Sequence, residues 1–131
     1  MQRGCPYQNE LIDPTRIRKS IMAINNEQTL SQIHSLARLY QTGYRSPVID
    51  ASIQKLISLE RARLQRELEE LQEHLHAFEE KYNLSSEEIH RRFRRGELGD
   101  DADMFEWDAF YQMMLTVKDQ LETLQPETAS Q

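Results

Sequence analysis

Two groups of acidic side chains in the second half of the chain have spacings that could support metal-dependent chemistry. The first group has the order E-E-x-x-E on one predicted helix, and the second follows after 23 intervening residues as E-x-x-D. The members of the two groups are Glu69, Glu70, Glu73, Glu97 and Asp100. Carboxylates from two helices can hold Mg²⁺, which activates a water molecule as a nucleophile. A denser acidic run overlaps the second group and consists of Asp100, Asp101, Asp103 and Glu106.

This order of carboxylates resembles the signature of the all-α nucleotide pyrophosphatases. The resemblance implies an all-α, Mg²⁺-dependent hydrolase of nucleoside triphosphates. Gly96 and Gly99, however, place the E-x-x-D motif in a corner rather than within a helix. A half-chain rich in glutamate also produces short acidic patterns by chance. We therefore expect a non-enzymatic protein with no catalytic residue, no metal and no cofactor, and we keep the hydrolase as an alternative.

The acidic run has a simpler explanation in helix chemistry. An Asp at the N-cap and acids in the first turn complement the partial positive charge at a helix N-terminus. The run lacks the order of an EF-hand loop, which needs alternating acids, a central Gly and a final Glu. The four histidines form no H-E-x-x-H motif, and they are His34, His74, His76 and His90. We predict that the last helix begins near Asp101 or Asp103.

Residues 13–45 are expected to form a small basic helical region. Asp13-Pro14 is typical of a helix start. Three isoleucines then follow at helical spacing, at Ile17, Ile21 and Ile24. A second helix is predicted from near Asn26, and Gly43 suits its C-terminal cap.

The same region is open to a second interpretation. With a strand at residues 16–24 and a glycine turn at T-G-Y-R-S, residues 15–60 resemble ribbon-helix-helix DNA-binding domains. The resemblance implies a dimeric repressor whose paired strands read DNA bases, with Arg16, Arg18 and Ser20 as readers. From a helix, Arg16, Arg18 and Lys19 can still contact phosphates. We expect the helix and keep the ribbon-helix-helix repressor as an alternative.

The remaining chain is predicted to form a long helical hairpin at 46–124. Its helices are expected at 46–82, 85–95 and 101–124, between a flexible N-terminus at 1–12 and a disordered tail at 125–131. The middle helix has a capping box in Ser85 and Glu88.

Apolar residues form a coiled-coil-like seam on each long helix. The first seam consists of Leu64, Leu68, Leu71, Leu75, Phe78 and Tyr82, and the second of Trp107, Phe110, Met114, Val117, Leu121 and Leu124. Because each seam needs a cover, we predict an all-α fold in which the C-terminal helix returns antiparallel along a long central helix. Two such hairpins would pair as a four-helix homodimer.

Charge is divided unevenly between the two halves. Residues 1–66 carry ten Lys and Arg against five Asp and Glu, whereas residues 67–131 carry six against seventeen. This division indicates different partners for the two ends. No apolar run approaches the roughly 20 residues that span a bilayer, and residues 1–14 contain no apolar segment typical of a secretory signal. The single cysteine, Cys5, excludes an internal disulfide. We therefore expect a cytoplasmic protein that is not associated with membranes.

Residues 78–114 carry the pattern S-S-E-E, R-R-F, G-E-L-G-D-D-A-D and E-W. This segment resembles small prokaryotic proteins of toxin–antitoxin-type gene pairs. The resemblance implies an antitoxin-like protein whose partner is a toxin, with DNA as a second ligand. Aromatic residues and Met anchor protein interfaces, and an acidic rim would favour a basic partner. The expected partner-binding residues are Met104, Phe105, Trp107, Phe110 and Tyr111.

Overall fold

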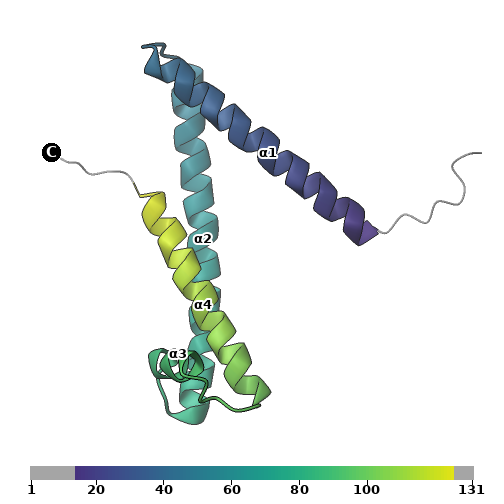
Figure 1. The fold of residues 1–131 in the computed structure, drawn as a ribbon. Helices are drawn as coiled ribbons and strands as arrows, with labels where there is room; N and C mark the ends of the chain where they lie inside the picture. Colours follow the sequence, from purple (N-terminus) through teal and green to yellow (C-terminus); the bar gives the residue numbers. More distant parts are fainter. Residues whose placement is uncertain (1–13, 126–131) are drawn as a thin grey trace, which may run out of the picture. The chain divides into compact units, whose positions relative to one another are not determined.

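The computed structural model describes residues 14–125, with side chains described from residue 26 onward. Four helices follow one another along this range (Figure 1). They are α1 (Pro14–Gln41), α2 (Pro47–Tyr82), α3 (Ser86–Arg94) and α4 (Ala102–Thr123). No strand occurs in this part of the chain, so the predicted all-α class is confirmed. The predicted flexible N-terminus at 1–12 lies outside the described residues, and so does the predicted disordered tail at 125–131 apart from Gln125.

The chain divides into two compact units, one ending at Pro47 and the other beginning at Val48. In the first unit, α1 is a single continuous helix of 28 residues. The predicted start of a separate helix near Asn26 is therefore wrong, and so is the alternative strand at residues 16–24. The sequence around Asn26 contains neither Pro nor Gly, so no local signal interrupts the helical hydrogen bonds.

The end of α1 is closed by Gly43 and Tyr40. Gly43 has a φ of +97°, which favours glycine, and its N–H donates to the carbonyl of Tyr40 at 3.0 Å. The Tyr40 hydroxyl donates to the carbonyl of Ser46 at 3.1 Å and accepts from its N–H at 3.2 Å. The guanidinium of Arg45 lies 5.0 Å from the centre of the Tyr40 ring. These contacts shape the turn that precedes α2.

In the second unit, α4 packs against the C-terminal part of α2 (Figure 1). Most of the buried core comes from the two predicted seams, with Leu64, Leu68, Leu71 and Leu75 from α2 and Trp107, Met114 and Val117 from α4. Half-buried seam residues pack against this core, namely Phe78, Tyr82, Phe110, Leu121 and Leu124. The predicted antiparallel hairpin is therefore confirmed.

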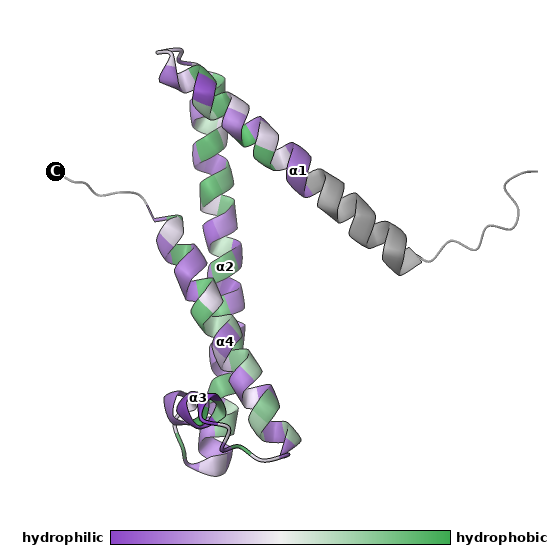
Figure 2. Ribbon diagram, in the orientation of Figure 1, coloured by the Kyte–Doolittle hydropathy of each residue, from purple (hydrophilic) through white to green (hydrophobic). Residues whose placement is uncertain are grey.

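The first part of α2 extends beyond the end of α4. A shallow depression joins Glu60 and Leu64 of α2 to Thr123 and Leu124, so α4 ends at this level. Nearer its start, α2 continues to carry hydrophobic residues, as Figure 2 shows in green. Their side chains are exposed, for example Leu56 at 60%. The hairpin core therefore occupies only the C-terminal part of α2.

Local capping signals define the turn between α2 and α4. Asn83, directly after α2, has a φ of +54°. The Ser85 hydroxyl caps α3 by accepting from the N–H of Glu88 at 3.1 Å, which confirms one half of the predicted capping box. The Glu88 carboxylate accepts from the guanidinium groups of Arg91 and Arg92. The carboxylate of Asp101 caps α4 by accepting from the N–H of Asp103 at 3.0 Å, which confirms the predicted start of this helix.

Candidate functional site

The five residues predicted to bind a partner lie in three different environments. Trp107 is fully buried, at 0% exposure. Its ring stacks on Phe78, with centroids 5.5 Å apart, and on Tyr82, at 5.7 Å. Trp107 therefore belongs to the core and is not available to a partner in this fold. Trp107 is buried because it belongs to the apolar seam of α4, and α4 packs this seam against α2.

Met104, Phe110 and Tyr111 are half-buried. Phe110 lies parallel to the ring of His74, with centroids 4.4 Å apart. Met104 packs against the core, and Tyr111 meets the ring of His90 at 5.2 Å. Burial, and next the negative charge of Glu87, raise the pKa of the Tyr111 hydroxyl. These three side chains consequently serve mainly to join the helices.

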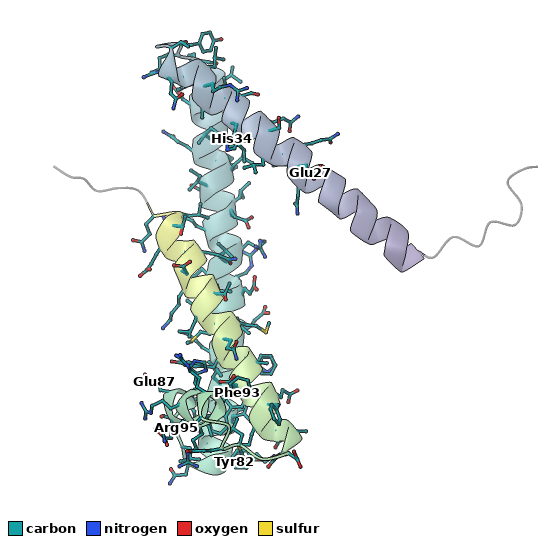
Figure 3. The ribbon with its side chains drawn as sticks, in the orientation of Figure 1. Glu27, His34, Tyr82, Glu87, Phe93 and Arg95 are labelled. Atoms are coloured by element: carbon teal, nitrogen blue, oxygen red, sulfur yellow. The ribbon has the colours of Figure 1, made fainter. Side chains whose placement is uncertain are left out.

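Phe105 is the predicted site residue that stands most clearly on the surface, at 46% exposure. Its ring meets Phe93 of α3 edge to face, with centroids 6.1 Å apart and an interplanar angle of 87°. Phe93 is itself 38% exposed. Figure 3 shows Phe93 at the same end of the hairpin as Tyr82 and Arg95. We call the side chains of Phe93 and Phe105 the Phe93–Phe105 pair.

Two sets of polar contacts hold α3 against its neighbours. The indole of Trp107 donates to the hydroxyl of Ser86 at 2.8 Å, and that hydroxyl donates to Glu79 at 2.8 Å. In the second set, Nδ1 of His90 lies 2.8 Å from Oδ1 of Asp108, a carboxylate that is only 1% exposed. These contacts fix the angle at which α3 presents Phe93.

Sequence inspection did not identify the His90–Asp108 contact. The two residues are 18 positions apart and belong to different helices. Asp108 directly follows Trp107, but consecutive residues of a helix point in different directions, so this adjacency did not mark Asp108 as buried. Helical periodicity also does not predict which residue of another helix will be the hydrogen-bond partner of a buried carboxylate.

The acidic run serves the structure of α4, as the helix-chemistry explanation predicted. Besides the cap from Asp101, the carboxylate of Asp103 accepts from the ammonium of Lys81 at 2.8 Å and from the hydroxyl of Tyr82. These two donors lower the pKa of Asp103, and the Asp103 carboxylate raises the pKa of both Lys81 and Tyr82. Asp101 and Asp103 are therefore engaged within the fold, whereas Asp100 and Glu106 are exposed, and an acidic rim that meets a basic partner stays a prediction.

The carboxylates of the hydrolase alternative point in different directions. Glu69 and Glu73 line a groove on one side of α2, whereas Glu70 lines a depression together with Phe110 and Met113. Glu97 lies 3.5 Å from Arg95. Within residues 14–125, no three His, Cys, Asp or Glu side chains are placed to hold a metal ion together. The convergence that this alternative requires is thus not present in the described part of the chain.

The predicted nucleic-acid contacts lie at the start of α1. The helix contains Arg16, Arg18 and Lys19, but their side chains lie outside the described residues. DNA contact by this helix stays a prediction. The strand that a ribbon-helix-helix dimer needs is replaced by helix at these positions.

The chain matches no protein-family model, no curated protein and no solved structure. None of the described helices is both long enough and apolar enough to cross a membrane. The case for a function accordingly depends on the geometry of the hairpin.

Proposed function

We propose that this chain is a non-enzymatic protein-binding module that docks a partner through the Phe93–Phe105 pair. The observation that carries the proposal is the exposure of two aromatic rings that come from different helices and meet edge to face. Exposed aromatic side chains held in one orientation are typical anchors of protein interfaces, because they fill pockets on the partner at little cost in conformational entropy.

The support beneath the pair favours a docking role. Ile89, one turn before Phe93, is only 1% exposed, and Trp107, two residues after Phe105, is fully buried. The two helix segments that carry the pair are thus each anchored in the core by a neighbouring residue. A partner that binds there would meet a preformed surface, which reduces the entropy lost on binding.

The resemblance of residues 78–114 to antitoxin-like proteins supports a toxin as the class of partner. Both Phe93 and Phe105 lie inside this segment. As further parts of the same proposal, the module acts in the cytoplasm as a homodimer, and the basic start of α1 contacts DNA. The exposed hydrophobic residues in the first part of α2 support self-association, since they extend beyond the cover that α4 provides.

The experiment replaces Phe105 with the photo-crosslinking analogue p-benzoylphenylalanine in cells of the native source. Met113, on the same helix, has nearly the same exposure at 47% and supplies the matched control position. We expect one covalent adduct from position 105 and none from position 113. The captured protein is then identified by mass spectrometry, and its affinity for the purified chain is measured.

The affinity measurement decides between docking and incidental capture. We expect Phe105→Ala and Phe93→Ala each to weaken binding of the captured protein by at least tenfold, as for interface anchors, whereas Met113→Ala changes it less than twofold. Circular dichroism of each variant checks that the fold is kept. Equal affinities for wild type and Phe105→Ala would refute the proposed site.

A further inference from the structure

A groove of about 990 Å³ lies between α2 and α4, away from the Phe93–Phe105 pair. Its floor contains the buried core residues Leu75 and Met114. Tyr111 and Leu115 form part of the α4 wall, and the first turn of α3 closes one end of the groove at Ser86. Leu115 is exposed to 42%, so apolar surface is accessible at the edge.

α3 fills the space between α2 and α4 only at the end of the groove that Ser86 closes. α3 has nine residues and is about 13 Å long, whereas α4 has 22 residues and is about 33 Å long. α3 packs on both long helices through Ile89 and Ser86, and so it acts as a third helix only near the turn of the hairpin. On the other side of Ser86, no helix of this unit covers the space between α2 and α4. Its shape therefore suits another helix.

The charges around the groove restrict the chemistry of that helix. Four carboxylates line the groove, from Glu69, Glu73, Glu79 and Glu87, against two basic side chains, Lys118 and His76. His76 lies 4.0 Å from Glu79 and 3.4 Å from Glu80, so it leaves Glu69 and Glu73 without a basic neighbour among the lining residues of α2. One oxygen of Glu79 is already occupied by the N–H and hydroxyl of Ser86. The carboxylates of Glu69 and Glu73 stand one helical turn apart along α2. A complementary helix would place Lys or Arg along its edges and apolar residues on the floor.

We propose that this groove binds a basic amphipathic helix of a protein partner, which takes up the third-helix position beyond α3. Between Glu69 and Glu79 the α2 wall is about 15 Å long, which corresponds to roughly three helical turns of the bound segment. The helix packs its apolar stripe on Leu75 and Met114 and directs basic side chains to Glu69 and Glu73. The site is separate from the Phe93–Phe105 pair and does not depend on the proposed function.

The test uses two synthetic helical peptides of 14 residues with the same leucine stripe. The remaining positions are Lys in one peptide and Glu in the other. Fluorescence anisotropy measures the binding of each labelled peptide to the full chain. We expect the Lys peptide to bind and the Glu peptide not to bind, because the groove is acidic.

Matched charge variants then locate the site. Glu69→Gln/Glu73→Gln removes two charges from the groove, and we expect it to weaken binding of the Lys peptide by at least tenfold. Glu67→Gln/Glu70→Gln removes two charges from the same helix, but these residues line the depression on another side of α2. We expect this control to change the affinity less than twofold.

NMR of the labelled chain supplies a readout that does not depend on charge. Binding of the Lys peptide should shift the resonances of Tyr111 and Leu115 but leave those of Met113 and Phe105 nearly unchanged. Equal weakening by the two double variants would overturn the proposal, since it would show attraction to the acidic surface as a whole. The absence of peptide binding would also overturn the proposal. This holds as well if sedimentation shows a dimer, in which a second copy fills the groove in place of a partner helix.

Discussion

The indole Nε1 of Trp107 in α4 donates a 2.8 Å hydrogen bond to Oγ of Ser86, the first residue of α3. The Ser86 hydroxyl and N–H in turn donate to one oxygen of Glu79 in α2, at 2.8 Å and 2.9 Å. One small side chain, itself 4% exposed, therefore connects all three helices of the hairpin. The buried indole N–H and the half-buried carboxylate both depend on it.

We predict that Ser86→Ala lowers the free energy of unfolding by roughly 1–3 kcal/mol, because it leaves the indole N–H buried without an acceptor. Trp107 is the only tryptophan, so its fluorescence reports unfolding in urea directly. Ser58→Ala is the control, since Ser58 lies on the exposed surface of α2, and we expect a change within about 0.5 kcal/mol. Equal stabilities of the two variants would show that the Ser86 contacts contribute nothing net.

Asp108 gives a second prediction, because its carboxylate is buried between two polar side chains. It lies 2.8 Å from Nδ1 of His90 and accepts from the amide of Gln112. Asp108→Ala should lower the free energy of unfolding by roughly 3 kcal/mol, since both partners lose their buried counterpart. Asp119→Ala, on the exposed face of the same helix, should change it by less than about 0.5 kcal/mol.

Hydrogen exchange tests where the Asp108 contact acts. We expect the amides of α3 to lose protection in Asp108→Ala before those of α2, because the contact joins α3 to α4. Uniform loss of protection in all three helices would instead indicate that Asp108 supports only the global stability of the hairpin.

The third prediction compares two leucines of α2. Leu71 is 4% exposed in the hairpin core, whereas Leu56 is 60% exposed in the part that extends beyond α4. Leu71→Ala should lower the free energy of unfolding by roughly 2–5 kcal/mol through lost burial and a cavity. Leu56→Ala should lower it by less than about 1 kcal/mol in dilute protein, because little buried area is lost. A larger effect at Leu56 than at Leu71 would contradict the observed position of the core.

The fourth prediction concerns the pH dependence of the Asp103 contact. Lys81 and Tyr82 lower the pKa of Asp103 by donating hydrogen bonds to its ionised form. The stabilisation is therefore fully present above the ordinary pKa of an Asp carboxyl, and it is lost as the pH falls through the lower pKa of the folded state. An NMR titration of the Asp103 carboxyl carbon should give a midpoint below 3.8.

Lys81→Met provides the comparison for that titration. Because the variant removes the largest cause of the shift, the pKa of Asp103 should rise. An unchanged midpoint would show that Lys81 does not pair with Asp103 in solution.

Local signals made the helix boundaries predictable. Ser46-Pro47, Ser85 and Asp101 act through their own neighbours in the chain, and α2, α3 and α4 begin at or next to these residues. The one wrong boundary, near Asn26, fell where no such signal exists. The seams were predictable for a similar reason, since the 3.6-residue period places Leu64 to Tyr82 on one face whatever lies opposite.

The candidate site was only partly predictable. Helical spacing already separated Trp107, which faces the seam, from Phe105, which does not. The contact of Phe93 with Phe105 depends on the angle of the corner at residues 95–101. That angle results from contacts between helices and is not encoded by periodicity.

The sequence by itself determined the three helices of the hairpin, the start of α3 and α4 and the two apolar seams, because each depends on residues within a few positions of one another. The tertiary structure decided which aromatic rings are buried and which are exposed, and how far α4 covers α2. It also decided the pairing of Ser86 with Trp107 and of His90 with Asp108, which are 21 and 18 positions apart. Such contacts form only after α3 packs into the angle between the long helices, so their free energy belongs to the assembled hairpin.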